Sequence, residues 1–444
     1  MSIISKVLTG FQELLPADQM MFDQMKHIIQ DVYHQYGYVS IETPVIERSD
    51  VLLAKGSEEA DKQIYFVQNG LTAKEPNALA LRFDLTIPFA RYVVDHMNDL
   101  SFPFKRSQLD RVYRGERPQK GRFREFYQCD VDVIGKGSLS VQYDAEMPCI
   151  IYQIFKKLDI GKFTIRINNR KVLNGFFESI GLSAFSAEVL RIIDKAEKIS
   201  HEKLLEAFAE LGVDDAQVAS ILNFVGIRGT VSDIIGGLYD LNIDNEQFNA
   251  GIDELKIVCD LLALSGVDAA YYTIDLAIAR GLDYYTGTVY ETTLDDYPIG
   301  SVCGGGRYEN LAENFTKEKL PGVGISIGLS RLFWQLKDQG LLKPMTHNVK
   351  SFVILPDKPE HMALSLHAAT KIRDAGGVCD VIMEDWNMKK KLQYATRKDA
   401  FYTVVVRDDY DTNDVVISLQ YKQGDDFVKD IVTMDALINM AHTH

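Results

Sequence analysis

The chain has 444 residues, of which 46% are hydrophobic and 25% charged, and this balance excludes a largely disordered or low-complexity protein. A chain longer than roughly 250 to 300 residues outgrows a single hydrophobic core, so two or three domains are expected. The formal net charge of −15 argues against a general nucleic-acid binder, because Lys and Arg carry most of the affinity for phosphate backbones.

The cysteines give no sign of a disulfide framework or of a zinc site. They are odd in number, widely spaced and form no Cys-x-x-Cys pair: Cys129, Cys149, Cys259, Cys303 and Cys379. The first fifteen residues contain no apolar stretch of signal-peptide length, and no segment approaches the roughly 18 apolar residues that span a bilayer. We therefore expect a cytoplasmic protein in a reducing compartment.

The N-terminal part of the chain predicts a helix followed by an edge strand. Residues 18–36 place apolar side chains at steps of three and four, and Gly37 ends this pattern. A short β-like run follows at 38–41, with Pro44 just after it. Because proline cannot donate a ladder hydrogen bond, this strand is expected at a sheet edge or interface, and dimerisation is a natural use for it.

The middle of the chain predicts a sheet interrupted by helices. Strand-like pieces at 79–83 and 126–134 flank a loop at 117–122, which predicts an antiparallel sheet. From 185 to about 265 apolar residues repeat at helical steps without a candidate active-site motif, so a helical insertion is the simplest account. Strand signals return at 287–292 and 322–328, before a helical segment at 332–336.

Beyond a linker at 341–347 the pattern changes to alternating strands and helices. Strands are predicted at 352–355, 378–383, 401–406 and 415–419, and helices around 362–372 and 389–399. The expected fold is therefore an α+β catalytic domain with a mixed, mainly antiparallel sheet, a helical insertion and a C-terminal α/β domain. The corresponding ranges are 1–171 and 266–340 for the two parts of the core, 172–265 for the insertion and 350–444 for the C-terminal domain.

The segment YRGERPQKGRFREFYQ, residues 113–128, is dense in basic residues. A solvated loop with incidental charges is the simplest alternative. The following strand favours a polar cleft instead, because Gln128, Asp130 and Asp132 alternate with apolar residues and so share one strand face. Arginine suits phosphate at such a cleft, since its planar fork makes bidentate, charge-assisted hydrogen bonds.

Other nucleotide and catalytic motifs are not expected. No Gly-x-x-x-x-Gly-Lys-Ser/Thr loop exists, which excludes a P-loop, and we expect neither a His-Glu-x-x-His metal site nor a nucleophile elbow of the Gly-x-Ser-x-Gly kind. In GVGISIG, residues 322–328, the third glycine is one place late for a dinucleotide loop, so close helix–strand packing is favoured. Hydrolase and zinc-enzyme functions are therefore not indicated.

Three segments resemble the signatures of class II aminoacyl-tRNA synthetases. Residues 114–128 resemble the second signature, in which an arginine after an aromatic residue holds the α-phosphate of ATP. Arg331 within GLSRL resembles the arginine of the third signature, which contacts the γ-phosphate, and Pro44 with its helix and strand resembles the first, which forms the dimer interface. Each is weak alone, but three in order at ordinary spacing make a strong signal.

Two further segments narrow the resemblance to the histidyl-tRNA synthetase family. RGLDYYTGTVYE, residues 280–291, resembles the histidine motif of that family, and CGGGRY, residues 303–308, resembles its glycine-rich partner. Without the family, two tyrosines beside a lone arginine would indicate core packing and a surface charge. The resemblance covers nearly the whole chain and is weakest over 172–265.

The resemblance implies a histidine pocket, whose acceptors would serve the ammonium group and the imidazole. The implied histidine-binding residues are Asp84, Thr86, Arg114, Gln128, Asp132, Arg280, Tyr284, Tyr285 and Tyr308. Some relatives carry Glu where this chain has Asp84 and Asp132, which leaves the pocket depth open. Alternatively, these carboxylates are partners of neighbouring arginines.

The resemblance also implies that histidine and ATP form histidyl-adenylate, from which histidine passes to tRNA(His). Arg114 and Arg280 are the implied catalytic residues at the α-phosphate, and Glu116, Arg122 and Arg331 complete the ATP site with Arg114. Mg²⁺ is implied on the β- and γ-phosphates, with no protein ligand set visible. Because no protein nucleophile is needed, catalysis would come from positioning and charge.

The C-terminal domain resembles the anticodon-binding domain of the family. Its expected tRNA contacts cluster with Lys398 on one predicted helix: Lys389, Lys390, Lys391 and Arg397. A solvated helix face is an equally common origin for such a cluster.

Two other functions remain as alternatives. A non-catalytic synthetase paralogue acts as the regulatory subunit of ATP phosphoribosyltransferase in histidine biosynthesis, but Arg280 and the C-terminal domain argue against it. A class II synthetase for threonine or proline is not expected to carry the string at 280–285.

Overall fold

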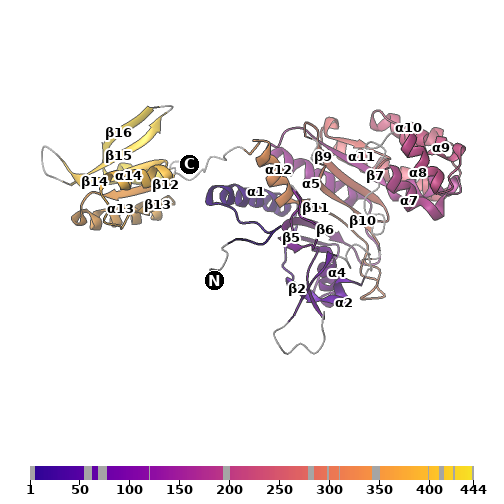
Figure 1. Ribbon diagram of the computed structural model, residues 1–444, viewed down its shortest axis with the longest axis horizontal. Coiled ribbons are helices and arrows are strands. Elements are labelled where there is room, and N and C mark those ends of the chain that lie inside the picture. The colour runs from indigo at the N-terminus through magenta and orange to yellow at the C-terminus, as the bar shows by residue number, and fades with distance from the viewer. Residues whose placement is uncertain are drawn as a thin grey trace. The chain divides into compact units, whose positions relative to one another are not determined.

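The computed structural model describes residues 6–54, 63–68, 78–119, 121–193, 201–278, 285–297, 300–309, 311–342, 351–398, 400–409, 415–423 and 426–442. The chain forms two compact units, 1–343 and 344–444, each built around its own large sheet (Figure 1). Among the described residues, no helix has both the length and the apolar character needed to span a membrane.

The first unit is built on an eight-stranded sheet of order β1-β5-β6-β11-β10-β9-β7-β8. The outer pairs β1–β5 and β7–β8 are parallel, and every pair between them is antiparallel. The predicted mixed, mainly antiparallel sheet is therefore confirmed. Its strands are β1 (Val39–Ser40), β5 (Phe104–Tyr113), β6 (Glu125–Ile134), β7 (Phe163–Asn169), β8 (Tyr272–Ile274), β9 (Thr288–Leu294), β10 (Ser301–Tyr308) and β11 (Gly322–Gly328).

One strand pairing predicted from the sequence is wrong. Residues 79–81 form β4, which lies in a separate three-stranded sheet of order β2-β4-β3 with β2 (Ile46–Arg48) and β3 (Tyr65–Val67). The antiparallel partners of β6 are β5 and β11, and the sequence does not reveal β5 as a strand. The reason is that β5, FKRSQLDRVY, buries charged and polar side chains such as Arg106 and Gln108, so it lacks an apolar alternation.

Helices α1 and α12 pack against β6 on the side opposite its polar face. The Phe22 ring of α1 meets the rings of Tyr127 in β6 and Phe333 in α12, with centroids 5.4 and 5.3 Å apart. The buried Tyr33 hydroxyl donates to the Cys129 carbonyl at 2.9 Å. Packing therefore leaves the even-numbered side chains of β6 for the other face. The helices of this core are α1 (Pro16–Gln35), α2 (Ser49–Leu52), α4 (Thr86–Asp95), α5 (Gln142–Leu158), α6 (Arg170–Ser179) and α12 (Leu329–Asp338).

Helices make up most of the described part of the region predicted as a helical insertion, and Figure 1 shows α7 to α10 gathered in one bundle. Its elements are η2 (Ser183–Phe185), α7 (Ser186–Ile193), α8 (His201–Glu210), α9 (Asp215–Val225), α10 (Val231–Asp240), α11 (Glu246–Leu264) and η4 (Ala269–Tyr271). Capping boxes at Asp214 and Thr230 satisfy backbone N–H groups at the starts of α9 and α10. Glycines let α11 approach α6 closely, since a Cβ on Gly251 would lie 2.6 Å from the Val172 nitrogen.

The second unit is a three-layered α/β domain. Its sheet has the order β13-β12-β14-β15-β16, with β13, β12 and β14 parallel to one another. Side chains of β12 alternate between a core with α13 and α15 and a smaller core with α14. The elements are β12 (Ser351–Pro356), η5 (Pro359–His361), α13 (Met362–Asp374), β13 (Val378–Val381), α14 (Met388–Arg397), β14 (Tyr402–Asp408), β15 (Val415–Gln423), β16 (Asp426–Val432) and α15 (Met434–His442).

Candidate active site

Strand register brings a set of polar side chains onto one face of the first sheet. In β6 the residues Gln128, Asp130 and Asp132 alternate with buried apolar residues, as the sequence predicts. Asp130 is paired across the sheet with Gln108 of β5 and Ser326 of β11. Because cross-strand partners point to the same face, these residues form one polar surface opposite α1 and α12.

Arg106 and Asp132 form a buried ion pair at the centre of this surface. Arg106 Nη2 lies 2.8 Å from Asp132 Oδ2, and neither side chain is more than 5% exposed. The Tyr308 hydroxyl donates to Asp132 Oδ1 at 2.9 Å. Burial raises the pKa of the Asp132 carboxyl, while the Arg106 charge and the Tyr308 hydrogen bond oppose that rise. Both oxygens of Asp132 are therefore engaged by the protein.

Asp130 is buried beside this pair but is satisfied less completely. Its Oδ2 lies 3.9 Å from Arg106 Nη2, and its Oδ1 has no hydrogen-bond partner within the described residues. Burial raises the pKa of Asp130 to about 7, with Asp132 adding to the rise and Arg106 opposing it. The nearby Gln128 donates from Nε2 to Ser326 Oγ at 2.9 Å.

The N-terminus of α4 supplies a third carboxylate. Asp84 Oδ1 accepts from the Ile87 backbone N–H at 3.1 Å, which satisfies one of the unpaired N–H groups of the first helical turn. Burial raises the pKa of the Asp84 carboxyl, against the opposing effects of that hydrogen bond and of the Arg114 and Arg106 charges. Arg114 is held by a 3.1 Å hydrogen bond from its Nε to the Phe83 carbonyl.

These side chains surround a small pocket. It is lined by Thr86, Asp130, Asp132, Tyr285, Tyr308, Gly324, Ile325 and Ser326. Glycines make room for its walls: a Cβ on Gly324 would collide with the Asp132 carboxylate, and one on Gly306 would lie 2.8 Å from the Tyr285 ring. Of the predicted histidine-binding residues, the structure thus places Thr86, Asp132, Tyr285 and Tyr308 around one cavity.

The predicted nucleotide residues lie at the loop between β5 and β6. Arg122 is exposed, and its Nη1 lies 3.7 Å from Glu116 Oε2. Arg331, in the first turn of α12, faces the same loop, since a Cβ on Gly121 would lie 3.9 Å from Arg331 Cγ. The Ser330 hydroxyl accepts from the Tyr127 backbone N–H at 2.9 Å and so ties α12 to β6. The second and third signature segments therefore meet at one loop.

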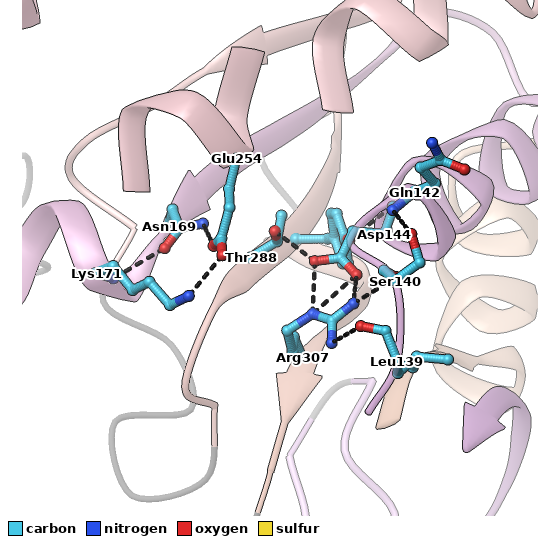
Figure 2. A network of polar contacts seen from close by, with 10 residues as sticks. Leu139, Ser140, Gln142, Asp144, Asn169, Lys171, Glu254, Thr288 and Arg307 are labelled. Carbon is cyan, nitrogen blue, oxygen red and sulfur yellow. Dashed lines mark hydrogen bonds and ion pairs between the residues drawn. The ribbon is translucent and has the colours of Figure 1, made fainter. Parts of the chain in front are cut away.

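A buried ion pair supports the segment that carries Tyr285. In Figure 2, Arg307 of β10 lies against Asp144 of α5, with Arg307 Nη2 2.5 Å from Asp144 Oδ1 and Nε 3.0 Å from both carboxylate oxygens. The same guanidinium donates to the carbonyls of Leu139 and Ser140 at 3.1 and 2.9 Å. Thr288 Oγ1 donates to Asp144 at 2.7 Å, and the Arg307 carbonyl accepts from Thr286 N–H at 2.8 Å.

Two predicted residues, Arg280 and Tyr284, lie outside the described residues. Three residues that belong to the site were not singled out from the sequence: Arg106, Asp130 and Ser326. The alternation that placed Gln128 and Asp132 on one face already included Asp130 and could have identified it. No sequence signal identified Arg106 or Ser326, because each reaches the site from another strand.

Residues 324–328, GISIG, match the letters of Gly-x-Ser-x-Gly, so the expectation that this pattern is missing is wrong. The structure gives it a different meaning. Ser326 lies inside β11, paired with Asp130 and Gly304, whereas a nucleophile elbow sits on a sharp turn between a strand and a helix. The serine is a polar member of the sheet face.

In the second unit, three of the four predicted tRNA contacts are exposed on α14: Lys389, Lys390 and Arg397. The Lys390 ammonium lies 4.0 Å from the centre of the Trp386 ring. Lys391 is only 4% exposed and donates from Nζ to the Pro356 carbonyl at 2.7 Å. Its place is in the interior, so it is not part of the exposed basic cluster.

Comparison with known proteins gives the same family. A family model described as histidyl-tRNA synthetase matches residues 10–332. A histidine–tRNA ligase of Clostridium tetani is 50% identical over 404 residues and covers 91% of each chain. The chain belongs to the histidyl-tRNA synthetase family. The resemblance drawn from the motifs and the class II synthetase fold is thereby confirmed.

Solved structures of this family extend the comparison to the whole chain. The histidyl-tRNA synthetase from Nostoc sp. PCC 7120 is 40% identical, with a TM-score of 0.89 over 99% of this chain and all of that one (100%). An ATP phosphoribosyltransferase regulatory subunit/histidyl-tRNA synthetase from Bacillus halodurans is 19% identical, with a TM-score of 0.73 over 89% of this chain and 97% of that one. The second match shows only that the fold is shared, so fold alone does not separate ligase from regulatory subunit.

Proposed function

We propose that this chain joins L-histidine to tRNA(His), first by forming histidyl-adenylate from histidine and ATP and then by transferring histidine to the tRNA. The observation that carries the proposal is the arrangement of one sheet face, where buried carboxylates and tyrosines line a pocket beside a loop dense in arginine. The 50% identity to the Clostridium tetani histidine–tRNA ligase supports the same activity.

The amino acid would lie with its carboxylate toward the arginine loop and its side chain in the pocket. Asp84 and Gln128 supply acceptors for the ammonium group, and Thr86 lines the cavity. Tyr285 and Tyr308 form walls against which an aromatic ring can pack. Tyr284, from the histidine motif, is included in this pocket on the resemblance.

In the first step the histidine carboxylate attacks the α-phosphate of ATP, an oxygen–phosphorus bond forms, and pyrophosphate leaves with the bridging oxygen. Arg114 is suited to the α-phosphate because its Nε hydrogen bond to Phe83 and its position over the Phe126 ring, 5.2 Å away, fix the guanidinium. Fixed positive charge lowers the barrier where negative charge develops. Arg280 is proposed for the same phosphate on the resemblance.

Glu116, Arg122 and Arg331 complete the proposed ATP site. They converge on the loop after β5, so a triphosphate extending from Arg114 meets two further arginines. Mg²⁺ would accompany ATP and neutralise part of the phosphate charge. Within the described ranges no three His, Cys, Asp or Glu side chains are grouped as a metal site.

The C-terminal unit is proposed to bind tRNA through Lys389, Lys390 and Arg397. A homodimer is proposed through the edge of the first sheet, where β1 is the outermost strand and Val39 is 52% exposed. Because the substrates belong to translation, a cytoplasmic location is proposed as well.

Exchange of pyrophosphate into ATP, tested with each amino acid, checks the first step. Histidine alone should support exchange, and addition of tRNA(His) transcript should yield aminoacylated tRNA. If no amino acid supports exchange, that result would favour the regulatory paralogue. Exchange with threonine or proline would assign a different class II synthetase.

A further inference from the structure

We infer that Asp130, together with Asp132, determines specificity for the substrate side chain by accepting a hydrogen bond from a ring N–H of the imidazole. This inference rests on the proposed function and adds a residue to the pocket.

Both carboxylate oxygens of Asp132 already interact with protein groups, although Asp132 lines the pocket. Its Oδ1 accepts from the Tyr308 hydroxyl at 2.9 Å, and its Oδ2 forms an ion pair with Arg106 Nη2 at 2.8 Å. Each oxygen of its carboxylate therefore has a protein partner before any ligand arrives.

Asp130 presents the opposite case. It is 2% exposed and lines the pocket, yet its Oδ1 has no partner in the part of the chain that the structure describes. The nearest approach of Arg106 is to the other oxygen, at 3.9 Å. A buried acceptor without a partner is costly, so a bound N–H donor at Oδ1 would restore a lost interaction.

The position of Asp130 along the strand selects the part of the substrate that it meets. The substrate carboxylate must meet the α-phosphate near Arg114, at the loop end of β6. The side chain then points along β6 away from the loop, toward Asp130 and Asp132. Two residues of a strand span about 6.6 Å, so Asp130 lies one step deeper than Gln128, which we place at the ammonium group.

The surrounding residues hold Asp130 in place for this role. Ser326 is its cross-strand partner on β11, and the Ser326 side chain opposes the rise in the pKa of Asp130. Gln128 in turn donates to Ser326 Oγ at 2.9 Å. Arg106 supplies a buried positive charge between the two carboxylates, which allows both to lie in one small pocket. Arg106 and Ser326 are accordingly positioning residues.

The test compares the full-length chain with its Asp130→Asn variant in histidine-dependent pyrophosphate exchange and by calorimetric titration. Loss of the charged acceptor should raise the KM and Kd for histidine on the order of 10- to 100-fold, with a smaller effect on kcat. Asp260→Asn, an exposed position on α11, removes the same charge and should leave both constants unchanged.

A ligand without ring N–H groups distinguishes a hydrogen bond between the imidazole and Asp130 from a purely structural role of Asp130. Wild type should prefer histidine to 3-(2-thienyl)alanine, whose five-membered ring offers no N–H, and Asp130→Asn should lose most of that preference. A merely structural role would weaken both ligands equally, and that result would overturn the inference. Should Asp130→Asn fail to fold, Ser326→Ala must show a partial loss of the same preference; an undiminished preference would overturn the inference.

Different results would overturn the proposed function and the role of Asp130. Absence of histidine-dependent exchange in the unaltered chain would overturn the proposed function and this inference with it. Normal exchange in wild type, with unchanged KM and preference in Asp130→Asn, would overturn only the role of Asp130.

Discussion

Replacing Arg307 by methionine tests whether the buried network of Figure 2 stabilises the catalytic unit. The side chain of Asp144 is fully buried (0% exposed), and that of Arg307 is 7% exposed. Arg307→Met would leave the Asp144 carboxylate without its charged partner. Removing one member of a buried pair typically costs about 3 to 5 kcal/mol, so we expect the free energy of unfolding to fall by that amount.

Urea unfolding followed by tryptophan fluorescence is the suitable assay. The chain has two tryptophans, Trp334 in the first unit and Trp386 in the second, so a Trp386→Phe background makes the signal report the first unit. Adding Asp144→Leu to Arg307→Met should recover part of the loss, because the unpaired charge is removed as well. A loss below about 1 kcal/mol in Arg307→Met, with no recovery in the double variant, would refute this account of the network.

Three further outcomes follow from the site and from the C-terminal unit. Arg114→Ala should lower the adenylation rate about a hundredfold or more in single-turnover assays, because it removes a charge that stabilises the transition state; an unchanged rate would remove Arg114 from the mechanism. Burial raises the pKa of Asp130 from 3.8 to about 7, so the folded state binds its proton more tightly than the unfolded state, and stability should fall as pH rises through this interval. Asp130→Asn should show a shallower decline in urea titrations across pH, and an identical slope would contradict the raised pKa. Lys390→Ala should weaken tRNA binding and reduce its salt dependence, whereas Lys391→Ala should lower the unfolding free energy of the second unit, since Lys391 is buried; the reverse pattern would refute the assignment.

The polar face of β6 could be predicted from the sequence because strand periodicity acts within a few residues. Side chains of a strand alternate between faces, so Gln128, Asp130 and Asp132 had to point the same way once the strand was recognised. The apolar residues between them marked the strand, and the packing of α1 decided which face was covered. Local rules of this kind also predicted the helical character of the insertion and four strands of the C-terminal unit, but they missed β16.

What the sequence could not provide is the chemistry that depends on partners far along the chain. Gln128 and Ser326 are bonded across 198 residues, and Asp144 and Arg307 across 163. Arg106 belongs to β5, whose sequence lacks the apolar alternation of a strand because several of its buried side chains are charged or polar. Only the paired strands and their register reveal that this arginine neutralises carboxylates inside the pocket.

The glycines of β10 and β11 show why the site occupies this part of the sheet. A side chain at Gly324 would collide with Asp132, and one at Gly306 would press on the Tyr285 ring. Glycine at these two positions therefore leaves room for the Asp132 carboxylate and the Tyr285 ring, which both line the pocket. Ser326, paired with Gly304, is the small polar exception. In this sheet, the glycines lie within strands and leave space beside the pocket. In a phosphate-binding loop, glycines would instead form a turn whose backbone holds an anion.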